Sequence, residues 1–154
     1  MSSVSVQGNS LASGSYDKTV KVWNMETNRE VTQFQHEDQV MCVKLHDNLL
    51  ISASFDNSTR IWDIKTGNQL HKLSHSGECY NFDLNASKTV LAVACDTSVV
   101  LWDYKKATKI KEFKFGENID DVRFNPAGNT IVAGLGGGEI FKIDVQFGSK
   151  DQAA

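Results

Sequence analysis

Side chains of the three kinds used in nucleophilic catalysis occur close together near the middle of the first half of the chain. They are His36, Asp56 and a serine, either Ser52 or Ser54. A histidine oriented by a carboxylate can take the proton of a serine hydroxyl, so this combination is found in hydrolases. Such a site needs an exposed serine, and the G-x-S-x-G turn that presents one is absent from the sequence. A hydrolase that uses His36, Asp56 and Ser54 is therefore an alternative, and not our first expectation.

The histidine and aspartate recur further along the chain. His75 follows His36 by 39 residues, and Asp96 follows Asp56 by 40 residues. In this second copy both serine positions have become alanine. A catalytic centre that occurs twice, once without its nucleophile, is poorly explained by hydrolysis. The recurrence favours a structural role, and we expect no enzymatic activity.

The segment 131–144, IVAGLGGGEIFKID, carries a glycine run that could cradle phosphate. A dinucleotide loop has the pattern G-x-G-x-x-G between a strand and a helix, and here Glu139 takes the place of the last glycine. The residues that follow alternate like a strand, and no Lys-Ser or Lys-Thr pair closes the run as in a P-loop. We therefore predict a glycine-rich turn between two strands and no nucleotide site.

Histidine and cysteine side chains could also bind a metal. None of them shows the spacing of zinc ligands; they are His36, Cys42, His46, His71, His75, Cys79 and Cys95. Two of the cysteines fall inside strand patterns, where a thiol behaves as a small apolar side chain. We expect neither a metal nor another cofactor.

Bulk composition places the chain among globular proteins. It has 154 residues, of which 40% are hydrophobic and 23% charged, with a formal net charge of −3. This mild acidic balance gives no support to a nucleic-acid or membrane-surface partner, which needs clustered Lys and Arg, and no feature indicates a small-molecule ligand. The odd cysteine count, the lack of a secretion-type start and the lack of a membrane-length apolar run predict an intracellular protein, cytoplasmic or nuclear.

The strongest signal is internal similarity. The segments 11–24 (LASGSYDKTVKVWN), 50–63 (LISASFDNSTRIWD) and 91–103 (LAVACDTSVVLWD) align with one another. Their tryptophans are 39 and 40 residues apart, and each follows an aspartate by six positions. These aspartate–tryptophan pairs are Asp17 with Trp23, Asp56 with Trp62, and Asp96 with Trp102. A period near 40 residues indicates a repeat architecture.

Each period reads as four short strands joined by turns. In the second period we predict strands at 40–45, 49–54, 58–62 and 69–73, from runs of alternating or β-branched residues. The linking pieces HDN, FDN and IKTGN supply the Asn, Asp and Gly that tight turns need. No segment has a sustained helical period with capping residues. The sequence therefore predicts an all-β protein.

These features resemble the WD-repeat family: the W-D or W-N endings, the aspartate upstream and a histidine that opens the next unit. The resemblance implies β-propeller blades of four antiparallel strands, about four here, in a ring that usually has seven. It predicts blades at about 1–35, 36–74, 75–114 and 115–148, which form a partial propeller over 1–148, and a C-terminal tail at 149–154. We expect the chain to be the C-terminal part of a longer propeller. The alternatives are a half that pairs with itself or another chain, and an open arc.

The resemblance also implies that the recurring polar residues form a buried hydrogen-bonded chain within a blade, as buried polar groups require. The expected members are His36, Ser54, Asp56, Trp62, His75, Asp96, Trp102, Asp17 and Trp23. On the same spacing the fourth unit has Phe115, Gly137 and Ile143 where His, Asp and Trp are expected. We therefore predict that the fourth blade lacks this chain.

For function, the resemblance implies a non-enzymatic scaffold that binds partner proteins or peptides through the loops of its blades. The loop positions that match are Tyr16, Lys18, Glu37, Asp38, Phe55, Asn57, Ser76 and Glu78. Tyr16 and Phe55 are the sharpest candidates, because aromatic residues are enriched at interface hot spots. Further WD repeats that complete the ring are a second expected partner.

A narrower hypothesis comes from the short connections VQGNSLASGS and KLHDNLLISAS. They are similar to the compact repeats of F-box/WD-repeat proteins, which recruit substrates to ubiquitin ligases. The chain would then be the substrate-recognition part of such an adaptor, since the sequence contains no F-box. A scaffold in RNA processing or signalling is the alternative.

Overall fold

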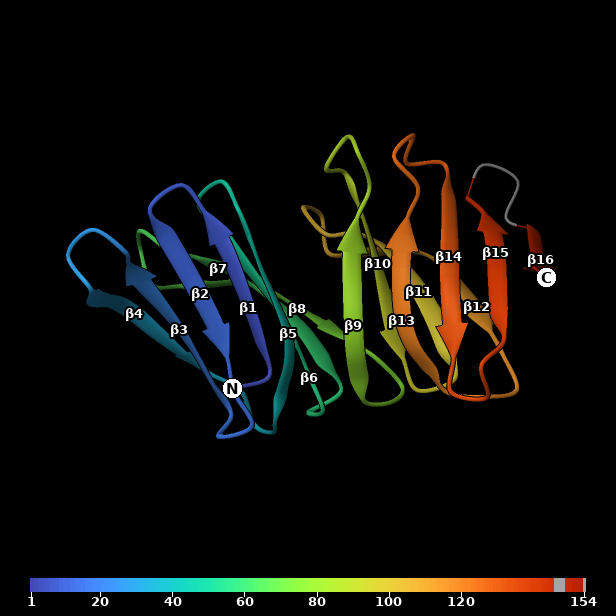
Figure 1. Ribbon diagram of the computed structural model, residues 1–154, viewed down its shortest axis with the longest axis horizontal. Coiled ribbons are helices and arrows are strands. Elements are labelled where there is room, and N and C mark those ends of the chain that lie inside the picture. Colours follow the sequence, from blue (N-terminus) through green and yellow to red (C-terminus); the bar gives the residue numbers. More distant parts are fainter. Residues whose placement is uncertain (146–148, 154) are drawn as a thin grey trace. The chain divides into compact units, whose positions relative to one another are not determined.

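The computed structural model describes residues 1–145 and the backbone of residues 149–153. In this part the chain forms sixteen strands, arranged as four antiparallel sheets in which neighbours in sequence are neighbours in space (Figure 1). We call these sheets blades 1 to 4. Blade 1 contains β1 (Ser3–Gln7), β2 (Ser10–Gly14), β3 (Thr19–Asn24) and β4 (Arg29–Gln35). Blade 2 contains β5 (Val40–His46), β6 (Leu49–Ser54), β7 (Ser58–Asp63) and β8 (Gln69–Ser74). Blade 3 contains β9 (Cys79–Leu84), β10 (Val90–Cys95), β11 (Ser98–Asp103) and β12 (Thr108–Lys114). Blade 4 contains β13 (Ile119–Phe124), β14 (Thr130–Leu135), β15 (Ile140–Asp144) and β16 (Ser149–Ala153).

The all-β prediction is confirmed, and in blade 2 each strand begins at the predicted residue and ends within one residue of the predicted end. The turns of this blade take the left-handed backbone conformation at the expected residue types. Asp47 has φ 54°, Asn57 has φ 61° and Gly67 has φ 71°. Asn, Asp and Gly adopt this conformation at the least cost, which is why the turns could be located in the sequence.

The segment 149–154, expected as a C-terminal tail, contains strand β16 (Ser149–Ala153). Strand β16 pairs antiparallel with β15, from Asp144 opposite Ser149 to Ile140 opposite Ala153, while Ala154 lies outside the described residues. The segment SKDQA contains no β-branched or aromatic residue, so its composition does not indicate a strand. Backbone pairing with the open edge of β15 determines its structure instead.

The chain divides into two compact units, Met1–Cys79 and Tyr80–Ala154. In the first unit the core lies between blades 1 and 2. It contains Ala12, Val20, Val22 and Phe34 from blade 1 and Val40, Val43, Leu45, Leu50 and Trp62 from blade 2. In the second unit the core lies between blades 3 and 4. It contains Ala92, Ala94, Val99, Leu101 and Phe113 from blade 3 and Ile119, Val122, Ile131, Ala133, Leu135 and Ile143 from blade 4.

The first strands of paired blades are also joined by side chains that accept from backbone N–H groups. Val43 donates to Ser3 Oγ at 3.2 Å, and Leu45 donates to Ser5 Oγ at 3.0 Å. In the second unit Phe124 donates to Asp83 Oδ2 at 3.0 Å. The partners are 40, 40 and 41 residues apart, so the repeat period of the sequence reappears as the contact between neighbouring first strands.

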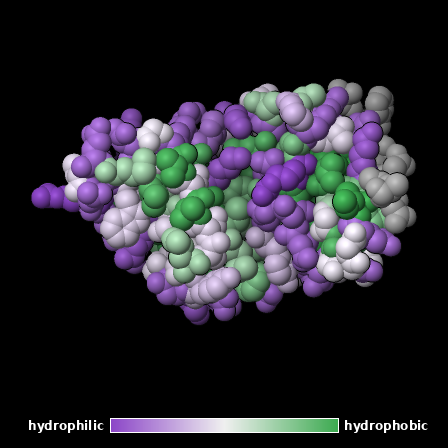
Figure 2. All heavy atoms as spheres, in the orientation of Figure 1, coloured by the Kyte–Doolittle hydropathy of each residue, from purple (hydrophilic) through white to green (hydrophobic). Residues whose placement is uncertain are grey.

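The surface is hydrophilic over most of the face in Figure 2, but hydrophobic residues gather over β1 and over β14 and β15. The exposed apolar side chains of these strands include Val4 and Val6 in blade 1 and Val132 and Ile140 in blade 4, which are 53%, 57%, 41% and 44% exposed. In each unit these strands therefore present apolar side chains outside the core.

Candidate functional site

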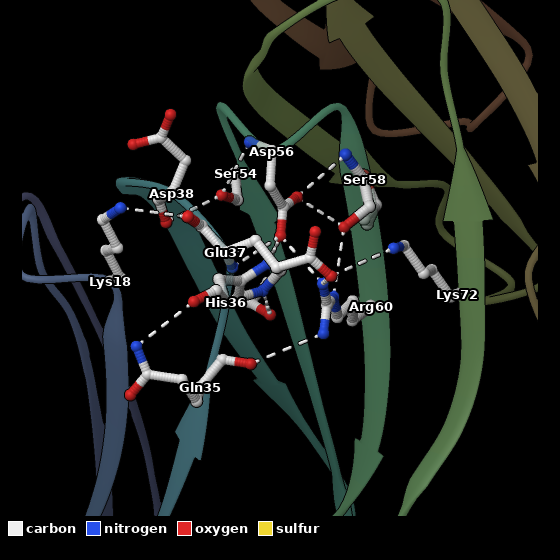
Figure 3. A network of polar contacts seen from close by, with 12 residues as sticks. Lys18, Gln35, His36, Glu37, Asp38, Ser54, Asp56, Ser58, Arg60 and Lys72 are labelled. Carbon is white, nitrogen blue, oxygen red and sulfur yellow. Dashed lines mark hydrogen bonds and ion pairs between the residues drawn. The ribbon is translucent and has the colours of Figure 1, made fainter.

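Blade 2 contains a buried hydrogen-bonded chain that joins three of its segments. Trp62 on β7 donates from Nε1 to Ser52 Oγ on β6 at 2.9 Å. Ser52 Oγ lies 2.7 Å from His36 Nε2. On the other side of the ring, His36 Nδ1 lies 2.8 Å from Asp56 Oδ2 in the β6–β7 turn, and Figure 3 shows these two residues. His36, Ser52 and Trp62 are at most 6% exposed. The chain ties the loop before β5 to the middle of the sheet and to the turn after β6.

The direction of each hydrogen bond follows from the chemistry of the groups. Burial lowers the pKa of His36 below its ordinary value, although its contact with Asp56 partly opposes this. The imidazole is therefore neutral near pH 7, with one N–H and one acceptor nitrogen. Since a carboxylate can only accept, Nδ1–H donates to Asp56 and the hydroxyl of Ser52 donates to Nε2. Ser52 Oγ is then free to accept from Trp62, so every polar atom in the chain has its partner.

Asp56 is the hub of the surrounding network. Its carboxylate accepts from the N–H of Glu37 at 3.1 Å, from the N–H of Ser58 at 3.0 Å and from the Ser58 hydroxyl at 2.6 Å. Burial raises the pKa of Asp56, but the hydrogen bonds from His36, Ser58 and Glu37 together outweigh it and hold the pKa well below its ordinary value. The carboxylate is thus ionised, and it organises the loop and the turn around it.

Arg60 completes the network and was not identified in the sequence. Its Nη2 lies 2.9 Å from Asp56 Oδ2 and 3.1 Å from Glu37 Oε1, and its Nη1 donates to the carbonyl of Gln35 at 3.5 Å (Figure 3). The guanidinium carbon is 5.9 Å from the centre of the Trp62 ring. The side chain is only 10% exposed. Its place between Ser58 and Trp62 on a strand with period two was the signal that could have indicated burial.

The serine expected in this chain was Ser54, but the structure brings Ser52 to the histidine. Ser54 Oγ donates to the carbonyl of Asp38 at 3.0 Å and accepts from the N–H of Asp56 at 3.1 Å. Ser54 therefore supports the turn and does not contact His36 in the described structure. Ser52 is fully buried, and its hydroxyl already has two partners. This geometry gives no support to a hydrolase with Ser54 as its nucleophile.

Blade 1 contains part of the same arrangement. Trp23 donates from Nε1 to Ser13 Oγ at 3.3 Å. Asp17 Oδ1 accepts from the N–H of Thr19 at 3.0 Å and from its hydroxyl at 2.6 Å, in the same way that Asp56 accepts from Ser58. Both expected residues of blade 1 thus make the contacts of their blade 2 counterparts with the neighbouring serine or threonine. They are not buried as expected, because Asp17 is exposed and Trp23 is half-buried.

The remaining expected members lie in the third repeat. His75 Nε2 is 3.2 Å from the hydroxyl of Thr59, within the first unit. Asp96 sits in a turn with φ 47°, and its carbonyl accepts from the N–H of Ile119 at 2.8 Å. Trp102 is 8% exposed. A hydrogen-bonded chain that joins these three residues remains a prediction.

Blade 4 replaces the polar chain by apolar contacts and open space. Phe115 packs edge-on against Phe141 at 5.1 Å between ring centres, and Ile143 is fully buried. The glycine run forms the predicted turn between β14 and β15, with Gly138 at φ 90°. Beside it lies a cavity of about 250 Å³, lined by Lys114, Phe115, Gly116, Glu117, Leu135, Glu139 and Phe141.

Most of the residues predicted to bind a partner lie on the surface of loops and turns. Those that are exposed are Tyr16, Lys18, Glu37, Asn57, Ser76 and Glu78, whereas Asp38 and Phe55 are half-buried. The structure joins two of these loops, because Lys18 Nζ donates to the carbonyl of Glu37 at 3.0 Å. Tyr16 is 55% exposed, but Phe55 is less accessible than its position in a turn suggested.

Comparison with known families agrees with this geometry. The family model described as WD domain, G-beta repeat matches residues 1–24, 28–63 and 67–103. The chain belongs to the WD40 repeat family, whose domains are generally non-catalytic scaffolds for protein interactions. A comparison with curated proteins gave no match. The matched residues include the three tryptophans and end before blade 4, where the polar residues are replaced.

In the part of the chain that the structure describes, no helix is long and apolar enough to cross a membrane.

Proposed function

We propose that this chain is a non-enzymatic scaffold that binds partner proteins or peptides through the loops of blades 1 and 2. The observation that carries the proposal is the contact between Lys18 and Glu37, which joins the β2–β3 turn to the loop before β5. A second link is the hydrogen bond from the N–H of Val40 to the carbonyl of Ser15 at 3.0 Å. These two contacts hold the loops together, and the ring of Tyr16, which is 55% exposed, belongs to the β2–β3 turn. A rigid aromatic side chain on a fixed loop is a common anchor for a protein partner.

Affinity capture with matched variants tests this proposal. The wild-type chain, Tyr16→Ala and Val31→Ala are each used as bait in a cell extract, and bound proteins are quantified by mass spectrometry. Val31 is a suitable control because it is 56% exposed on β4 of the same blade, away from the loops. We expect proteins that Tyr16→Ala loses and Val31→Ala retains. Identical capture by all three baits would contradict the proposal.

Two narrower functions of this kind differ in their partners. The short connections between strands favour the substrate-recognition part of a ubiquitin ligase adaptor, and a scaffold in RNA processing is the alternative. The family match supports WD repeats in general and adds no support for the adaptor. Ubiquitin ligase subunits among the Tyr16-dependent proteins would favour the first function. RNA-processing proteins would favour the second.

We further propose that blade 4 packs against another WD repeat, supplied by a second copy of the chain. Gly14 in blade 1 shows what such packing requires, because a Cβ there would lie 2.8 Å from Val40 Cγ1 and from Val43 Cγ1 of blade 2. Gly134 stands at the equivalent position of blade 4, with open space beside it. It lines a cavity of about 180 Å³ together with Asp121, Arg123, Val132 and Ile140. This cavity can receive a β-branched side chain.

The matching surface is on β1. Val4 pairs with Ser13 in blade 1 in the same way that Val43 pairs with Ser52 in blade 2, so Val4 is the counterpart of Val43. Val4 and Val6, two residues further along β1, are both exposed. Sedimentation velocity tests the association. We expect self-association that rises with concentration, that Val132→Glu abolishes and that Val31→Glu leaves unchanged. A wild-type chain that stays monomeric at high concentration would refute a second copy as the partner.

A further inference from the structure

The cavity of blade 4 occupies the place that the polar network fills in blade 2. Every residue that lines it stands at the repeat position of a residue drawn in Figure 3. Residues in the loop before the first strand of blade 4 follow their blade 2 counterparts by 79 residues. Residues in the hairpin of the second and third strands follow theirs by 81 residues. In chain order the lining residues Lys114, Phe115, Gly116, Glu117, Leu135, Glu139 and Phe141 correspond to Gln35, His36, Glu37, Asp38, Ser54, Ser58 and Arg60.

The backbone of the two blades supports this correspondence. The N–H of Val40 donates to the carbonyl of Ser15, and the N–H of Ile119, which is 79 residues further on, donates to the carbonyl of Asp96. The pairing of the first two strands shifts register directly after Val40 in blade 2 and directly after Ile119 in blade 4. The loop, the first strand and the turn thus have equivalent positions in both blades.

In blade 2 a guanidinium group fills this place. Arg60 pairs with the carboxylates of Asp56 and Glu37, donates to the carbonyl of Gln35 and lies over the ring of Trp62. Carboxylates, a carbonyl and an aromatic face are what a planar guanidinium recognises, since it can pair with oxygen atoms in its plane and stack against a ring.

In blade 4 the guanidinium is missing but groups that recognise one are present. Phe141 replaces Arg60, and its ring packs edge-on against Phe115. Glu117 and Glu139 bring two carboxylates to the lining, against the one positive charge of Lys114. The place therefore combines aromatic surface, a negative balance and a cavity of about 250 Å³. That volume lies below the roughly 300–1,000 Å³ of sites for drug-sized ligands, and it suits a single side chain.

We propose that this cavity binds an arginine side chain of a partner protein, which takes the place that Arg60 occupies in blade 2. The guanidinium pairs with the carboxylates of Glu117 and Glu139 and packs against Phe141. This inference rests on the proposed function as a protein-binding scaffold, and it names the chemistry of one contact on a blade distant in sequence from Tyr16.

Nuclear magnetic resonance of the full chain, labelled with ¹⁵N, tests the site directly. The probes are three blocked tripeptides of the form Gly-X-Gly, in which X is arginine, citrulline or lysine. Citrulline has nearly the shape of arginine without its charge. We expect the arginine peptide to shift the amide signals of Gly116, Glu117 and Gly137 in a saturable way, and the citrulline peptide to leave them unchanged. Equal shifts with citrulline or lysine would overturn the assignment to arginine, as would no shift with any peptide.

Variants locate the binding and separate it from the proposed function. Combined Glu117→Gln and Glu139→Gln substitutions should weaken binding of the arginine peptide about tenfold, because charge-assisted hydrogen bonds are lost. Glu30→Gln, which removes one carboxylate from β4, should leave it unchanged. Phe141→Arg places an internal guanidinium in the cavity and should abolish binding. Unchanged affinity in all three variants would refute the site. If Tyr16-dependent capture persists in that case, only the arginine inference fails and the scaffold stands.

Discussion

Blades 2 and 4 have the same strand order and the same first-strand register, yet their loop ends are filled in different ways. Blade 2 has five polar side chains there, each hydrogen-bonded to at least one of the others: His36, Ser52, Asp56, Ser58 and Arg60. Blade 4 places two phenylalanines there and leaves a cavity. The four-stranded fold of a blade therefore does not depend on the polar chain.

The difference also shows that the polar residues act as a set. If Trp62 alone were replaced, Ser52 and His36 would keep buried polar atoms with fewer partners, which costs more free energy than an apolar group in the same place. Blade 4 has lost histidine, aspartate and tryptophan together, and the phenylalanine, glycine and isoleucine that replace them have no side-chain hydrogen bonds to satisfy. In blade 4 the positions of histidine, aspartate and tryptophan are therefore replaced together, and no buried polar group is left there by the loss of a single member.

The largest effect is expected from Asp56→Ala in blade 2. The change removes the acceptor for His36, the loop N–H of Glu37 and the guanidinium of Arg60, so we expect a loss of about 3 kcal/mol in the free energy of unfolding. Gly137→Ala, at the same position of blade 4, is the control. Its Cβ would meet only the end of the exposed Glu117 side chain, and we expect less than about 1 kcal/mol. Urea denaturation measures both free energies of unfolding. Equal losses would show that the hydrogen bonds of Asp56 add nothing to the stability of blade 2.

Trp62→Phe should have the next largest effect. The change removes the hydrogen bond to Ser52 and leaves part of the volume of the indole empty in the core, so we expect a loss of about 2 kcal/mol. Ile143→Val at the equivalent position of blade 4 loses one buried methyl group and should cost about 1 kcal/mol. Thermal and urea denaturation provide the values. A cost at Ile143 as large as that at Trp62 would show that the hydrogen bond adds nothing.

Between pH 7 and pH 5 the pH dependence of stability should come from His36 of blade 2. His36 has a lowered pKa in the folded protein, so below its ordinary value of 6.5 the unfolded chain takes up a proton that the folded chain does not. The contribution of His36 to the free energy of unfolding is thus lost as the pH falls below 6.5. That of Asp56, whose pKa is also lowered, is lost only below 3.8. Urea denaturation from pH 7 to pH 5 should show a decline that His36→Phe, which copies blade 4, reduces. An unchanged slope in that variant would contradict this prediction.

Phe141→Arg should have the smallest effect and the opposite sign. It gives blade 4 the guanidinium of blade 2, beside Glu117 and Glu139, and should raise the free energy of unfolding by about 0.5 kcal/mol, since pairs near the surface contribute little. Phe141→Lys is the control, because it adds the charge without the planar group. Denaturation curves that show destabilisation by both changes would mean that the two blades are not equivalent at this position.

The sequence was sufficient to predict the strands of blade 2 within one residue, because turn residues and alternation act locally. It could not distinguish Ser52 from Ser54, since both lie on the same face of β6 and only the reach of His36 decides between them. Arg60 was missed because arginine is usually exposed, and its burial depends on Asp56 and Glu37 from outside its own strand. The replacements in blade 4 were visible in the sequence, but the cavity depends on how Phe115 and Phe141 pack.

The hydrogen bonds between first strands have a consequence for solubility. Strand β5 is an edge of its sheet, and an edge strand with unsatisfied N–H groups is a template for strand addition by another chain. The hydroxyl oxygens of Ser3 and Ser5 accept hydrogen bonds from two of these N–H groups, those of Val43 and Leu45. In the second unit Asp83 does the same for Phe124 of β13. The first strand of one blade thus shields the edge of the next against β-aggregation, with three polar side chains that lie outside every sequence motif of the repeat.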